Sequence, residues 1–304
     1  MNRTKKILAM AFTMFIGGLF LMGEGQAFAE MSGMQGHQHE GMQHMHGGGG
    51  SEVIVGIKTE PERIIVGTLT TVVFSFKNRE GKPVENLTIH HDRLIHVVIS
   101  SKDFSVFAHI HPQDFGLITP EMKKTALYPV RFTFPKAGRY IIGIDFAVND
   151  QPLSRHFLVD VAGEPKMGPP KQDFSREKRF GDLDVTFAST PERIMSGKEV
   201  TLSYIFKKNG KPVTDLEPWL SAPMHLAIIS VDLTQFIHTH GELPGMPAMG
   251  HHEHHMQMMM TVPEKFGPKI EVHMIFPAAG LYQIFGQVGY QGKVIATSFM
   301  VRVD

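Results

Sequence analysis

Three histidines with the same spacing occur twice in this chain. The first set is His96, His109 and His111, and the second set is His225, His238 and His240. Both sets read H-x12-H-x-H, and the second lies 129 positions after the first without a gap. Imidazole is a good ligand for copper, zinc and nickel ions. Three imidazoles kept in register through a duplication therefore indicate a site for a soft or borderline metal ion.

The spacing also predicts how the chain positions each triplet. Alternate residues of a strand face the same way, so His109 and His111 share a face. If the chain forms a hairpin that turns near Asp103, His96 lies opposite His111 and Val98 lies opposite His109. Opposed side chains have Cβ atoms ~4.5–5.5 Å apart, and metal–nitrogen bonds measure ~2.0–2.1 Å. Each triplet can therefore reach one ion.

A structural interpretation of the triplets stays open. Both faces of the predicted hairpin carry apolar residues, so the histidines could be packed core residues whose ring nitrogens bond to the backbone. The second copy is the better candidate for a working site, because it has an extra segment beside the triplet. His90 and His91 are weak candidates, since Trp219 and Leu220 replace them in the second copy. His156 and His273 are isolated and are interpreted as structural.

Two segments rich in histidine and methionine, residues 30–51 and 242–262, are the other candidates. From His111 to Phe134 is 23 positions and from His240 to Phe276 is 36, so the second copy carries 13 extra residues. The candidate ligands in the two segments are His37, His39, His44, His46, His251, His252, His254, His255, Met256 and Met258. Thioethers select Cu(I), so methionine with histidine points to copper, with silver as its mimic. Zinc or nickel would explain the histidines but not the methionines.

The composition and the first residues limit the function further. Residues 1–29 have a basic start, an apolar stretch and an Ala-Phe-Ala cleavage signal, as in a secretory signal peptide. We expect a periplasmic or extracellular protein with no membrane span after cleavage. The absence of cysteine excludes thiolate catalysis, disulfides and a blue-copper centre. A formal net charge of zero and the lack of a basic patch argue against nucleic acid as a partner.

Other landmarks besides the histidines repeat in the same order. TEPERI at 59–64 matches STPERI at 189–194, and FPKAGRY at 134–140 matches FPAAGLY at 276–282. Each copy consists of short runs rich in Val, Ile, Phe and Tyr, separated by Gly, Pro and Asn turns. About seven strands per copy are typical of an immunoglobulin-like sandwich.

The sequence therefore predicts an all-β fold. We expect two tandem immunoglobulin-like antiparallel β-sandwich domains after a disordered tail rich in His and Met. The expected boundaries are a signal peptide at 1–29, the tail at 30–51, domain 1 at 52–163, a linker at 164–181 and domain 2 at 182–304.

The second copy resembles bacterial exported immunoglobulin-like domains of the YtkA-like kind. Its PWLSAPMHL at 218–226 and FIHTH at 236–240 are similar to that family's aromatic-Leu-x-Ala-x-x-His-Leu and Phe-x-His-x-His-Pro stretches. Its FPAAGLYQIFGQV and ATSFMVRV runs look like the family's C-terminal strands. Gly241 stands where the family has proline. The resemblance covers most of 182–304; it implies the sandwich fold and suggests copper handling.

The leading hypothesis is a non-enzymatic, exported protein that binds, sequesters or delivers copper, as Cu(I) or Cu(II), or silver. Its partners would be metal ions and a periplasmic metal exporter or acceptor protein. One alternative is a tandem immunoglobulin-like binding or scaffold module with structural histidines. A metal-dependent enzyme, with Asp232 or Glu253 as base, is a further alternative without a supporting triad or carboxylate pair.

Overall fold

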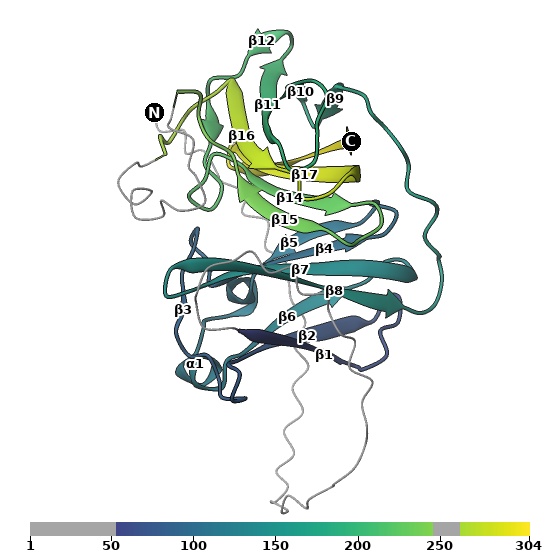
Figure 1. Cartoon of the computed structure of the whole chain (residues 1–304), viewed down its shortest axis with the longest axis vertical. Helices are drawn as coiled ribbons and strands as arrows, with labels where there is room; N and C mark the ends of the chain where they lie inside the picture. The colour runs from purple at the N-terminus through teal and green to yellow at the C-terminus, as the bar shows by residue number, and fades with distance from the viewer. Residues whose placement is uncertain (1–52, 246–261) are drawn as a thin grey trace, which may run out of the picture. The chain divides into compact units, whose positions relative to one another are not determined.

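The computed structural model of the chain describes residues 53–245 and 262–304. These residues are almost all β, as the sequence predicts, and form two antiparallel sandwiches (Figure 1). The expected signal peptide, the tail and most of the His/Met-rich loop lie outside the described residues. Within the described part, no helix is long and apolar enough to cross a membrane.

The first domain packs two sheets face to face (Figure 1). One sheet has the order β1-β2-β6, from β1 (Ile54–Glu60), β2 (Leu69–Lys77) and β6 (Leu127–Thr133). The other has the order β3-β7-β4-β5 with β8 also on β7, from β3 (Leu87–Thr88), β4 (Ile95–Ser101), β5 (Phe107–Ile110), β7 (Gly138–Val148) and β8 (Gln151–Val161). Burial alternates along β2, so Val72, Phe74 and Phe76 enter the core.

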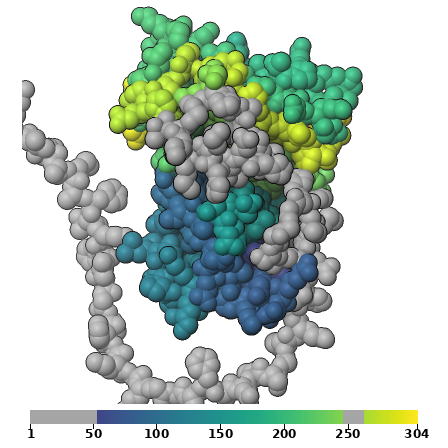
Figure 2. Space-filling view, turned by 60° about the vertical axis from the view of Figure 1, so that its left-hand side comes forward, coloured from purple at the N-terminus to yellow at the C-terminus, as the bar shows by residue number. Residues whose placement is uncertain are grey.

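The second domain repeats this plan with its own two sheets. One sheet runs β12-β11-β10-β9 with β16 on β11, and contains β9 (Glu177–Phe180), β10 (Leu183–Thr190), β11 (Glu199–Lys208), β12 (Lys211–Pro212) and β16 (Lys269–Ile275). The other runs β13-β17-β14-β15 with β18 on β17, and contains β13 (Leu216–Glu217), β14 (His225–Ser230), β15 (Phe236–His240), β17 (Gly280–Tyr290) and β18 (Lys293–Val303). Figure 2 shows the packed surface of the first domain in blue to teal and of the second in green to yellow.

Two local features differ from the sequence prediction. The segment expected as a linker, 164–181, contains β9, which pairs with β10 because Phe180 packs on the second core with its ring 5.6 Å from that of Phe299. A short 3-10 turn η1 (Pro112–Phe115) and a helix α1 (Pro120–Thr125) follow β5. The Thr119 side chain caps α1, and proline occupies its first position, so local signals explain this helix.

The two predicted hairpins are confirmed with the expected register. In β4–β5, Val98 pairs with His109, and in β14–β15 the equivalent Ala227 pairs with His238. His225 lies directly opposite His240. The period of two therefore puts all three histidines of each triplet on one face of the hairpin.

These hairpin faces meet each other across the two domains. A small apolar cluster joins Val98 and Ile141 of the first domain to Ala227, Ile229, Leu233 and Phe285 of the second. The Phe107 and Phe285 rings are stacked with centroids 4.2 Å apart. Phe236 lies directly over Gly143, where an added Cβ would be 2.3 Å from the ring.

We expect Gly143→Ala to weaken this contact between the domains. The new methyl group cannot fit against Phe236 without a shift of the ring, and overpacking of this kind costs ~1–3 kcal/mol. Gly168→Ala is the matched control, because nothing lies within 4 Å of its added Cβ. Thermal unfolding of both variants measures the difference. Equal stability of the two variants would contradict the interdomain contact.

Candidate metal centre

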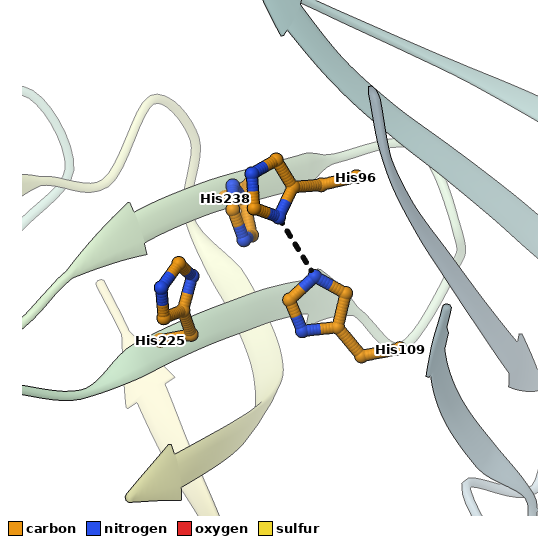
Figure 3. Close-up of side chains that lie close together, drawn as sticks. All are labelled: His96, His109, His225 and His238. Carbon is orange, nitrogen blue, oxygen red and sulfur yellow. Dashed lines mark hydrogen bonds between the residues drawn. The ribbon is translucent and has the colours of Figure 1, made fainter. Parts of the chain in front are cut away.

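The histidines of the two triplets lie together between the two domains. The His96 ring centroid is 5.0 Å from that of His238 and 5.5 Å from that of His225. His109 is 5.3 Å from His238 by the same measure. The side chains of the four point toward one another from the two hairpins (Figure 3). The duplication therefore does not produce two separate three-histidine sites, and this corrects the expectation of one site per copy.

Four of these histidines could hold one metal ion. His96, His109, His225 and His238 each offer a ring nitrogen, and the four atoms all lie within 4.8 Å of one another. His96 Nδ1 and His109 Nε2 are 3.1 Å apart (Figure 3). Metal–nitrogen bonds of ~2.05 Å in a tetrahedral site imply nitrogen–nitrogen edges of ~3.3 Å. Small ring rotations would therefore bring all four nitrogens to the spacing of tetrahedral ligands.

Backbone carbonyls fix the tautomers of two of the four rings. His96 Nε2 is 3.0 Å from the His90 carbonyl, and His225 Nε2 is 3.2 Å from the Leu220 carbonyl. A carbonyl oxygen can only accept, so both Nε2 atoms donate. The neutral ring then has a lone pair on Nδ1, which is the atom left to face the other histidines.

Side chains of the opposite domain orient the other two rings. His238 Nδ1 lies 3.3 Å from Asp145 Oδ2, and His109 Nδ1 lies 2.7 Å from Gln287 Oε1. Asp145 and Gln287 are equivalent in the repeat, because they pair with His96 and His225 respectively. The first histidine of each H-x-H motif is therefore oriented by the partner domain. With these oxygens as acceptors, the Nε2 atoms of His109 and His238 keep a lone pair. A second hydrogen bond of this kind is typical of histidines that bind metals.

These tautomers bring lone pairs face to face. With Gln287 Oε1 as the acceptor for His109 Nδ1, the atoms His96 Nδ1 and His109 Nε2 face each other as two acceptors 3.1 Å apart, and a shared proton or metal cation would satisfy both. Among the described residues, His225 Nδ1 and His238 Nε2 are buried and have no hydrogen-bond partner. A buried polar atom without a partner is costly, and a shared cation would satisfy all four nitrogens.

Burial keeps most of these imidazoles neutral. His96 and His225 are each 1% exposed. Burial, followed by repulsion from His238 and other neighbouring histidines, lowers the pKa of His96, His109 and His225 well below its ordinary value. Burial also lowers the pKa of His111 to about 4, although Asp114 opposes the shift. Neutral imidazole is the form that coordinates a metal, so these rings need not lose a proton before a metal binds.

The Asp145 carboxylate is the charged group of the centre. Its burial raises its pKa, but the hydrogen bonds from His238 and from the Ser154 hydroxyl, 2.6 Å away, bring the pKa below its ordinary value. The spacing of the histidines gives no indication of Asp145 or Gln287. A usable signal was present, because both are polar residues at the same place in two largely apolar strands, five positions after Tyr140 and Tyr282.

We expect Asp145→Asn to weaken metal binding about 10–100-fold, the usual effect of losing the partner that orients a ligating histidine. The neutral amide no longer holds the His238 proton by charge. Asp160→Asn is the control, because Asp160 pairs with Arg139 at the surface. Chelator competition with Zn(II) measures the affinities. An unchanged affinity for Asp145→Asn would show that His238 does not bind the metal through this arrangement.

Four further histidines lie beside the four-nitrogen group. His111 and His240 adjoin the four, with ring centroids 4.7 Å from His109 and 4.5 Å from His225. His90 and His91, expected to be weak candidates, also lie in the cluster: His91 is 3.7 Å from His240 between centroids. The expectation that the working site rests on the second copy stays a prediction, and the four-nitrogen group draws two histidines from each copy. The candidates outside the described residues are His37, His39, His44, His46, His251, His252, His254, His255, Met256 and Met258.

The remaining polar residues of the repeat stabilise turns and strands. Asp232 accepts hydrogen bonds from Ser230 and Thr234 at 2.6 and 2.8 Å, and Asp103 does the same in the first copy. Asp232 therefore closes the hairpin turn, which argues against a role as a general base. His273 lies 3.0 Å from the Thr201 hydroxyl on the opposite sheet of its domain.

A protein-family model matches both halves of the chain. The family is described as Domain of unknown function (DUF8832), and it matches residues 51–163 and 178–304, which are the two sandwiches. The chain belongs to this family. The expected resemblance to YtkA-like proteins therefore holds only for the immunoglobulin-like fold, because the matching family is DUF8832. The curated proteins contain no match to the chain.

Solved structures match this DUF8832 chain at very low similarity. The FdeC adhesin of Escherichia coli is 10% identical over 82% of this chain and 64% of its own, with a TM-score of 0.23. Invasin, a bacterial integrin-binding protein, is 11% identical over 82% of this chain and 39% of its own, with a TM-score of 0.20. The chain thus spans less than two thirds of either protein. TM-scores this low carry no argument about function.

Proposed function

We propose that this protein binds a transition-metal ion between its two domains, with His96, His109, His225 and His238 as the ligands. The gathering of four ring nitrogens within 4.8 Å of one another, with His96 Nδ1 and His109 Nε2 3.1 Å apart, is the observation that carries the proposal. A cation among these nitrogens would also give partners to the buried His225 Nδ1 and His238 Nε2.

The ligand set favours a borderline ion. Four imidazoles without a carboxylate or thiolate suit Cu(II), Zn(II) and Ni(II). We propose copper as the cargo, because the chain has 20 methionines and no cysteine, and its two His/Met-rich segments offer the thioethers that Cu(I) prefers. Four protein ligands would fill a tetrahedral ion and leave no open position for a substrate. The proposed role is therefore holding or delivering the ion rather than catalysis, in an exported protein as the N-terminal segment indicates.

Metal-dependent unfolding of the full chain tests the proposal. A ligand that binds the folded protein at a free concentration about 100-fold above its Kd stabilises it by ~3 kcal/mol. Binding within one short His/Met-rich stretch does not require the fold, so it adds little to this shift. We expect Cu(II) or Zn(II) to raise the melting temperature, and a chelator to reverse the rise. No shift with Cu(II), Zn(II), Ni(II) or Ag(I) would refute the proposal.

A binding or scaffold module is the second candidate. The apolar contact around Phe107 and Phe285 favours it, since this contact can hold the two domains together without a metal. In that case the histidines would only pack between the domains, and their replacement would lower the stability of the metal-free protein. The variant His225→Ala/His238→Ala/His240→Ala separates the two functions. Loss of the metal-induced stabilisation alone supports the metal centre, whereas equal losses with and without metal support the scaffold.

A further inference from the structure

The cluster contains more imidazoles than one ion can use. The cluster also contains four other histidines, each with its ring centroid 3.7–5.8 Å from that of a neighbouring histidine: His90, His91, His111 and His240. A second group of ring nitrogens, from His91, His225 and His240, also lies within 4.8 Å. His225 is common to both groups, so the two groups adjoin.

We propose that the cluster binds a second metal ion, with His91 and His240 as its ligands. This position lies next to the four-histidine position and adjoins His225. This inference rests on the proposed function and extends it from one ion to two. His240 Nε2 is buried and has no hydrogen-bond partner among the described residues, and so it is available as a ligand. His91 is more exposed than the buried His96 and His225, and the second position is therefore the outer one.

The second position uses the turn of the first copy, and the equivalent turn of the second copy has no histidine. His91 lies in a tight turn with a φ of 47°, and the equivalent Leu220 of the second copy has a φ of 50°. The two turns touch each other, because the Ser221 hydroxyl donates to Asp92 Oδ2 at 2.6 Å. On the opposite side, Leu220 replaces the histidine and no second nitrogen faces His111 from that turn position. The two turns have the same backbone conformation, and histidine in place of leucine at this position supplies His91 as the outer ligand.

His91→Leu is the sharpest test, because the backbone conformation of this turn already accepts leucine in the second copy. We expect this variant in the full chain to bind one Zn(II) fewer than the wild type, with the same melting-temperature rise on binding the first ion. His240→Ala should lose the same ion. His273→Ala is the control and should keep the wild-type number.

Cu(II) gives an independent readout of the distance between the ions. Two adjacent Cu(II) ions couple magnetically, so the resonance of the wild type should account for fewer spins than the bound copper. In His91→Leu the inner ion should recover its full signal. Unchanged metal content and unchanged coupling in His91→Leu would overturn the second position. If instead His96→Ala/His225→Ala binds as many ions as the wild type, the proposed function itself fails.

Discussion

We expect the variant His96→Ala/His225→Ala to lose binding of copper or zinc at the interdomain centre by about 100-fold or more. Loss of a single residue that only orients a ligand weakens metal binding about 10–100-fold, and this variant removes two ligands outright. The variant removes one residue from each domain, and both are 1% exposed in the wild type. The metal-induced rise in melting temperature should disappear.

The His/Met-rich segments stay intact in this variant, so total metal content will fall only partly. The loss of stabilisation, rather than the total content, is therefore the decisive measurement. His273→Ala serves as the matched control, because His273 bonds to Thr201 away from the cluster. If the double variant still melts at a higher temperature with metal, the ligands must lie elsewhere in the chain.

The second large effect is a loss of stability of the metal-free protein below pH ~6.5. In the unfolded chain each histidine takes up a proton near pH 6.5. In the folded protein burial lowers the pKa of His96, His109, His225 and His240, and lowers that of His111 to about 4. As the pH falls below 6.5 the unfolded state therefore binds more protons, and the free energy of unfolding decreases. Above pH 6.5 these histidines are neutral in both states and add no pH dependence.

The size of this effect follows from the pKa shift. One pKa unit corresponds to ~1.4 kcal/mol, so His111 alone contributes ~3 kcal/mol of lost stability by pH 4. Denaturant unfolding of the metal-free chain between pH 8 and pH 4 measures it. The matched comparison is a variant with His111→Gln, which should lose less stability over the same range. A free energy of unfolding that is constant down to pH 5 would contradict the burial of these rings as neutral groups.

Much of the local structure could be predicted from the sequence. The two-residue period and the turn at Asp103 were enough to pair Val98 with His109, and the same register recurs between Ala227 and His238. This works because hairpin register depends on residues that are close in the chain. The strand β9 and the helix α1 were missed, because the first is stabilised by a distant core and the second is only one turn long.

The meeting of the two triplets could not be predicted in this way. The hydrogen bonds that orient the rings across the domains join residues 93 and 178 positions apart, His238 to Asp145 and His109 to Gln287. No period or spacing connects such pairs, since their contact depends on how two sheet faces fit together. The Phe236 ring over Gly143 is part of this fit.

By itself, the sequence determined that the chain has two related β-sandwiches and that each presents three histidines on one hairpin face. Both properties follow from local alternation and from the repeat. Only the tertiary structure decided that the two faces meet, that His91 joins them, and that Asp145 and Gln287 orient rings of the opposite domain. The physical reason is that burial of the apolar residues around Phe107 and Phe285 brings the sheets together, and the histidines beside them then lie in one cluster.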